Sequence, residues 1–153
     1  MANRIMRREH RFRIREVDAC EPDVLDTLKE LHTQTFLDRA PFPDFEAGHW
    51  WIATELGQPV AFAGMVASTM ATGTGYLSRV GVLREHCGHG LQRRFMRAVE
   101  QRGRRSGLYC IVSDTTGNVV SANNFIRCGY VLFQPRRPWA WASSLYWRKM
   151  IRC

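Results

Sequence analysis

The chain has 153 residues, of which 45% are hydrophobic, and 22 Lys and Arg against 14 Asp and Glu give a net charge of +8. This length and apolar content predict one compact domain over residues 1–153 with a sizeable core, residues 1–10 being loose. No apolar run reaches membrane-spanning length and the arginine-rich start has no apolar signal segment, so we expect neither a membrane protein nor a secreted one.

Cysteine usage favours a reducing compartment. The five cysteines are odd in number and lack paired spacing, which predicts free thiols and a cytoplasmic protein rather than a disulfide framework. The run His86-Cys87-Gly88-His89 holds metal-binding residue types, but no second cluster of ligands accompanies it. We therefore expect no metal site.

The first half of the chain predicts strands and a helix. Alternating residues 12–17 predict a strand, and apolar residues at helical spacing after Pro22 predict a helix. The aromatic-rich connector 36–48 has room for a second short helix. Residues 50–66 predict a hairpin that turns at Gly57-Gln58-Pro59.

The second half predicts a β-α-β unit. Apolar strand 76–82, an amphipathic helix broken at Gly103, and apolar strand 108–113 follow one another, so the two strands should be parallel. Both faces of the second strand are apolar, as in the centre of a sheet. A short helix at about Val119–Arg127 comes next. A strand from Tyr130 and a last strand near the C-terminus complete the predicted elements.

The helix of this unit opens at Gly88-His89-Gly90. Its first N–H groups have no partner within the helix, and the helix dipole adds partial positive charge there. Glycines let a ligand approach the backbone closely, so the loop suits a phosphate or pyrophosphate. The alternative is that the two glycines only form a turn.

Two segments resemble the signatures of the GNAT N-acetyltransferases. Val82–Gln92 resembles the acetyl-coenzyme A signature R/Q-x-x-G-x-G/A after a valine-ended strand, and Asn118–Tyr130 resembles the second signature. Both occur in the family's order and separation, over about residues 76–133. The resemblance implies an α/β fold: a mixed, twisted central sheet of six to seven strands, helices on both faces, and a cofactor cleft between strands 76–82 and 108–113.

The resemblance also implies acetyl-coenzyme A as cofactor. The cofactor-binding residues that it implies are Val80, Val82, Cys87, Gly88, His89, Gly90, Leu91, Gln92, Arg93, Asn118 and Phe125. Two of them depart from the signature, since Cys87 stands where the family prefers Arg or Gln and Gln92 stands where it has a small residue. Basic residues 84–105 would surround the phosphates, and acidic region 16–46 would lie beside the acceptor. Plain solvated faces are the alternative.

The catalytic groups transfer less directly. Phe125 stands where many members carry a tyrosine that protonates the leaving thiolate, and Ser113 where some carry a glutamate base. Asp114, at the carboxyl end of a parallel strand, and Ser121, one turn before Phe125, are therefore the candidate catalytic residues. A turn or capping role for Asp114 and a packing role for Ser121 are the alternatives. Backbone N–H groups around Val80–Val82 would stabilise the oxyanion.

Cys87 invites a covalent mechanism, because a cysteine at a helix N-terminus among arginines forms a thiolate more readily. The resemblance, however, places this position beside the phosphates rather than the thioester, so we expect direct attack by the amine.

The predicted function is transfer of an acetyl group from acetyl-coenzyme A to a primary amine of a small molecule or a protein. One alternative is an arginine-rich nucleic-acid-binding module, with Trp139, Trp141 and Trp147 available for stacking. The other is a catalytically degenerate acetyl-coenzyme A binder. No membrane partner is expected, nucleic acid is disfavoured, and a homodimer is left open.

Overall fold

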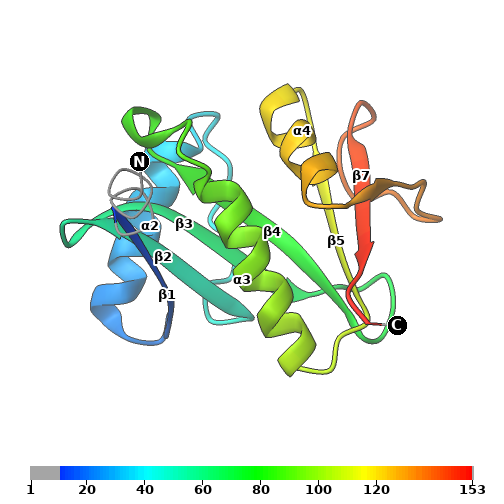
Figure 1. Cartoon of the computed structure of the whole chain (residues 1–153), viewed down its shortest axis with the longest axis horizontal. Helices are drawn as coiled ribbons and strands as arrows, with labels where there is room; N and C mark the ends of the chain where they lie inside the picture. The colour runs from blue at the N-terminus through cyan, green and yellow to red at the C-terminus, as the bar shows by residue number, and fades with distance from the viewer. Residues whose placement is uncertain (1–10, 153) are drawn as a thin grey trace, which may run out of the picture. The chain divides into compact units, whose positions relative to one another are not determined.

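The computed structural model describes residues 11–152 (Figure 1). The elements in chain order are β1 (Phe12–Val17), α2 (Pro22–Thr35), β2 (His49–Glu55), β3 (Gln58–Ala67), β4 (Thr74–Val82), the short 3-10 helix η1 (Arg84–His86), α3 (Leu91–Arg105), β5 (Cys110–Thr115), α4 (Val119–Arg127), β6 (Val131–Leu132) and β7 (Leu145–Met150). The prediction for residues 1–10 lies outside the described residues. Within the described residues, no helix combines the length and apolar character that a bilayer span requires.

The strands form one seven-stranded sheet in the order β1-β2-β3-β4-β5-β7-β6. Strands β4 and β5 are parallel, whereas β7 runs antiparallel to both β5 and β6. The last strand of the chain therefore lies between β5 and β6. The predicted α/β fold, with a mixed sheet of six to seven strands, is confirmed, and so is the parallel β-α-β unit.

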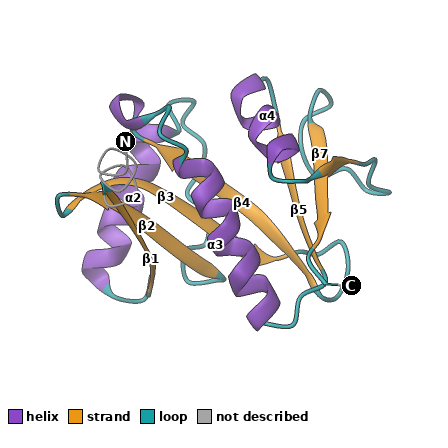
Figure 2. Cartoon of the chain, in the orientation of Figure 1, coloured by secondary structure: helices purple, strands orange, loops and turns teal. Residues whose placement is uncertain are grey.

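Two details differ from the prediction. Connector 36–48 contains no helix and is drawn as loop in Figure 2. Pro41 and Pro43 explain this, because proline disfavours the helical conformation of the residue before it and removes an N–H donor. Helix α3 also continues through Gly103 to Arg105. A Cβ at Gly103 would lie 2.8 Å from the Ile151 side chain, so this glycine serves close packing rather than helix termination.

The chain divides into two compact units, which we describe separately. The first holds the described residues up to Gly64 together with Arg79–Leu91, and the second holds Met65–Ser78 and the described residues from Gln92 onward. The prediction of one domain over residues 1–153 stays a prediction.

In the first unit, α2 packs closely against strands β3 and β4. Its buried residues are Leu28, Leu31 and His32. A Cβ at Gly81 of β4 would lie 2.3 Å from the Thr35 hydroxyl, so only glycine allows the end of α2 to approach β4 this closely. The end of α2 thereby lies against β4.

In the second unit, side chains of α3 and α4 contact residues of β7. The Phe125 ring of α4 stacks on Trp147 with a centroid distance of 5.6 Å. Glu100 of α3 is only 5% exposed. Lys149 donates a hydrogen bond of 2.8 Å to its carboxylate and one of 2.6 Å to the Cys128 carbonyl. One lysine thus joins α3, the end of α4 and β7.

Candidate active site

The loop between β4 and α3 has the backbone shape that the sequence predicts. Gly88 and Gly90 both have positive φ, 83° and 76°, which residues with a side chain rarely adopt. Helix α3 begins at Leu91, directly after the second glycine. The first N–H groups of a helix have no partner within the helix, so this helix start suits an anion.

This loop is fixed to the edge of the first unit. His86 pairs with Glu55 at 2.9 Å, and Glu55 also accepts a hydrogen bond of 2.8 Å from Arg11. The Arg11 hydrogen bond is the main reason that the pKa of Glu55 lies below its usual value. The Phe12 ring lies 5.4 Å from the His89 ring. The start of β1 and the end of β2 thus hold the loop in place.

Cys87 lies in this loop rather than at the start of α3. It is exposed and follows η1, four positions before Leu91. Its sulfur lies 3.6 Å from the carbonyl oxygen of Leu83 and 3.8 Å from that of Val82. The predicted position at a helix N-terminus is therefore wrong, and carbonyl oxygens face the thiol.

Gln92, which departs from the family signature, joins α3 to α4. Its amide nitrogen donates to the Ser121 hydroxyl at 2.7 Å, and its amide oxygen accepts from Asn124 at 2.8 Å. The side chain therefore has a structural role that a small residue could not fill. Because the Ser121 oxygen is the acceptor in this bond, its own proton is left to donate to a ligand.

Asn118 and Phe125 position α4. The Asn118 side-chain oxygen caps the helix by accepting the Ser121 N–H at 2.9 Å, which leaves its amide nitrogen as the group able to meet a ligand. Phe125 is 2% exposed, stacked on Trp147 and edge-on to Tyr130 at 5.0 Å. It is a core residue with no hydroxyl to protonate a thiolate.

Asp114 is held by two donors. Its Oδ2 accepts a hydrogen bond of 2.5 Å from the Tyr76 hydroxyl and one of 2.8 Å from the Trp139 indole. Its Oδ1 accepts none from the described residues, so one oxygen of this half-buried carboxylate can still accept a proton. The carboxylate also fixes the orientation of Trp139.

Ser113 cannot replace the family's glutamate base. It is buried and donates a hydrogen bond of 2.7 Å to the Leu77 carbonyl. The registered parallel pairs of β4 and β5 end at Tyr76 opposite Val112, just before this bond. The Ser113 side chain therefore bridges the two strands where their ladder stops.

His32 is a candidate that the sequence analysis did not single out. It is 1% exposed, stacked on Phe36 at 4.7 Å, and lines a cavity of about 400 Å³. Its Nε2 has no hydrogen-bond partner among the described residues. Burial lowers the pKa of His32 below its usual value, and the charge of Arg79 adds to this. The sequence signal that could have identified His32 is its position on the apolar face of an amphipathic helix.

Replacing His32 by Phe should make the protein less sensitive to acid. A histidine with a lowered folded-state pKa binds its proton more readily when unfolded, so stability falls as the pH drops below about 6.5. The variant lacks this linkage and keeps an aromatic ring against Phe36. Between pH 7.5 and pH 5, the melting temperature should fall less for the variant than for the parent protein. Equal losses in the two proteins would contradict this account.

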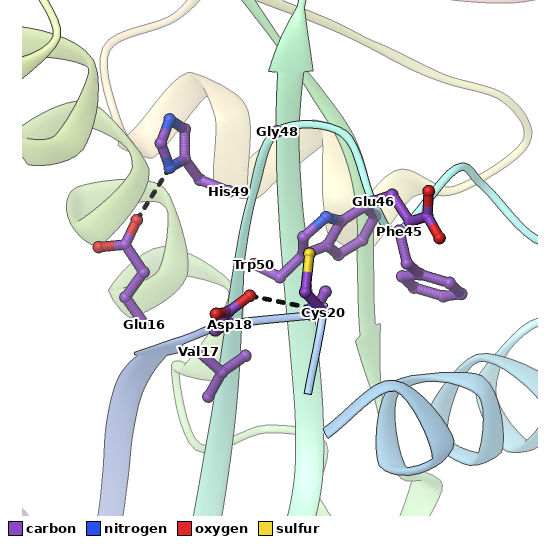
Figure 3. Close-up of a pocket in the computed structure, with 10 residues that line it drawn as sticks. Glu16, Val17, Asp18, Cys20, Phe45, Glu46, Gly48, His49 and Trp50 are labelled. Carbon is purple, nitrogen blue, oxygen red and sulfur yellow. Dashed lines mark hydrogen bonds and ion pairs between the residues drawn. The ribbon is translucent and has the colours of Figure 1, made fainter. Parts of the chain in front are cut away.

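A second cavity of the first unit is lined by acidic residues (Figure 3). Its volume is about 350 Å³, and Glu16, Asp18 and Glu46 contribute carboxylates to it. Glu16 pairs with His49 at 3.1 Å, and Asp18 accepts the backbone N–H of Cys20 at 2.9 Å. The cavity lies within the acidic region that the sequence analysis associates with the acceptor. In the described part of the chain, no group of three or more potential ligands could hold a metal ion.

Solved structures show where else this fold occurs. The ribosomal-protein-S18-alanine N-acetyltransferase of Escherichia coli matches with a TM-score of 0.72 at 14% identity, over 93% of this chain and 95% of that one. An acetyltransferase of Streptococcus agalactiae matches with a TM-score of 0.69 at 18% identity, over 92% and 99%. A PaiA N-acetyltransferase of Thermoplasma acidophilum, solved with coenzyme A, matches with a TM-score of 0.69 at 12% identity, over 91% and 98%.

Sequence comparison identifies the family of this chain. No curated protein sequence matches this chain significantly. The family model described as the acetyltransferase (GNAT) family matches residues 14–130, which include both glycines of the loop and all of α4. The chain therefore belongs to the GNAT acetyltransferase family, a family of acyltransferase enzymes that bind acyl-coenzyme A.

Proposed function

We propose that the protein transfers an acetyl group from acetyl-coenzyme A to a primary amine by direct attack. The observation that carries this proposal is the loop with two left-handed glycines that leads into α3, within a chain of the GNAT family. Backbone N–H groups of residues 88–93 would hold the pyrophosphate, and Asn118 would donate to the pantetheine arm. Family membership supports the acyl-coenzyme A part, whereas the acetyl group and the amine are inferred.

Acetyl-coenzyme A supplies an acyl carbon activated as a thioester. The amine must be neutral to attack it, and an alkylamine of pKa about 10.4 is mostly protonated at neutral pH. Asp114 is our candidate base, because its Oδ1 can accept the proton as the C–N bond forms. Backbone N–H groups at Val80 and Val82 would stabilise the oxyanion. The Ser121 hydroxyl would donate a hydrogen bond to the sulfur as the C–S bond breaks.

Two measurements test the proposal. Coenzyme A at millimolar concentration should raise the melting temperature, because a ligand that binds only the folded state stabilises it. Acetyl-coenzyme A with a panel of small amines and amine-bearing peptides should then release free thiol. Binding without turnover on any amine would favour a degenerate binder. Salt-dependent nucleic-acid binding without cofactor protection would favour the arginine-rich module.

Replacing Asp114 by Asn should lower turnover about a hundredfold or more, the range expected for loss of a general base, without changing cofactor affinity. The matched control is Tyr76→Phe, which removes one hydrogen bond to the carboxylate but leaves the base in place. Measuring the rate of thiol release should identify the base. If D114N releases thiol no more slowly than Y76F, Asp114 is not the base and only orients Trp139.

Cys87→Ser should keep turnover within a fewfold, because direct attack needs no enzyme nucleophile. In the parent protein, alkylation of Cys87 should be suppressed by coenzyme A. Cys20 provides an internal control: it is also exposed, and the Asp18 charge raises the pKa of its thiol. Mass spectrometry should show slow labelling of Cys20 with and without cofactor. A thousandfold loss of turnover in C87S with normal cofactor binding would instead make the cysteine the nucleophile.

A further inference from the structure

The second unit contains a cavity of about 680 Å³, and none of the residues assigned to the proposed reaction lines it. It lies between the β3–β4 turn, the connector from β6 to β7, and one side chain of β7. Its lining includes Phe133, Arg136, Arg137, Trp139 and Arg148. This volume is in the range of pockets that hold a small organic molecule.

All the charged residues that line this cavity are basic. Arg136, Arg137 and Arg148 line it, and no lining residue is acidic. None of the three forms an ion pair with another described residue. The Arg148 guanidinium lies 5.1 Å above the Phe133 ring, which leaves its N–H groups able to reach a ligand. Guanidinium groups pair with carboxylate and phosphate oxygens in a fork geometry, so an anion is the complementary ligand.

Hydrogen bonds and ring contacts fix the two aromatic side chains of the cavity, Trp139 and Phe133. The Trp139 indole donates to Asp114, and its ring meets Tyr146 edge-on at 4.7 Å. The Tyr146 hydroxyl accepts the backbone N–H of Ala140 at 3.0 Å, which fixes the next residue of the connector. Phe133 contacts Trp139 at 6.4 Å between ring centroids. A preformed aromatic surface favours a planar ligand, because little ordering is needed on binding.

We propose that this cavity binds a planar aromatic anion, in which a ring packs against Trp139 and Phe133 while a carboxylate or phosphate group meets the arginines. Arg136 and Arg137 are exposed and precede Pro138, and Arg148 approaches from the sheet. The anion therefore meets guanidinium groups from two different elements. The proposal does not depend on acetyl transfer.

Isothermal titration calorimetry without any cofactor tests this site. The probes are 2-naphthoate, 2-naphthyl phosphate and the uncharged 2-naphthamide, which share one ring system and differ in the polar group. We expect saturable binding of at least one anion, at least tenfold tighter than that of the amide and weaker at high salt. Whichever anion binds with the lower dissociation constant shows whether the site prefers a carboxylate or a phosphate.

The double variant R136A/R137A should bind the preferred anion at least tenfold more weakly. Its matched control is R13A/R15A, which removes two exposed arginines of β1 and the same net charge, and should bind like the parent. Circular dichroism should show both variants folded, because all four side chains are exposed. The proposal fails if neither anion binds at millimolar concentration, if the amide binds equally well, or if both double variants lose the same affinity.

Discussion

Replacing Lys149 by Met is expected to lower the free energy of unfolding by about 3–5 kcal/mol, because it leaves a buried carboxylate without its counter-ion. Glu100 is 5% exposed, and the Lys149 amine lies 2.8 Å from one of its oxygens. The Arg104 guanidinium, 3.9 Å from the other oxygen, is too exposed to replace the lysine. The variant also loses the hydrogen bond to the Cys128 carbonyl.

Denaturant unfolding measures this loss, and two further variants separate its causes. Lys29→Met changes the only other lysine of the chain, which is not buried, and should cost less than about 0.5 kcal/mol. The double variant E100Q/K149M removes both charges and should recover much of the lost stability. If K149M is no less stable than K29M, the buried pair does not stabilise the fold.

Replacing Gly90 by Val should raise the dissociation constant for coenzyme A tenfold or more, which corresponds to about 1.4 kcal/mol. Gly90 has a φ of 76°, and a β-branched residue is strongly disfavoured there. The loop must then change shape, and the new side chain obstructs the backbone N–H groups that we expect to hold the pyrophosphate. Calorimetric titration of the folded variant with coenzyme A gives the affinity directly.

Gly57→Val is the matched control for this change. Gly57 has a φ of 79°, close to that of Gly90, and nothing lies within 4 Å of the position of an added Cβ. The control therefore carries similar backbone strain in the β2–β3 turn, outside the loop. If both variants lose cofactor affinity equally, strain accounts for the effect. If G90V stays folded and binds like the parent, the loop is not the pyrophosphate site.

Features encoded by neighbouring residues could be predicted from the sequence. The bounds of β1 and α4 agree with the prediction, because alternation and a cap at Asn118 are local signals. The turn before α3 was also predictable, since Gly88 and Gly90 tolerate positive φ where other residues do not. The family resemblance followed from these local features, and the family match over residues 14–130 confirms it.

The sequence by itself therefore determined most of the elements, the parallel β-α-β unit and the glycine-shaped loop, but not the absence of a helix in connector 36–48 or the end of α3 beyond Gly103. Only the tertiary structure decided the place of β7 between β5 and β6, and the partners of the polar side chains. Asp114 meets Tyr76 from 38 positions away and Trp139 from 25, and Gln92 meets Ser121 from 29. Such pairs depend on how separate elements pack, and no local pattern of residue types specifies that packing.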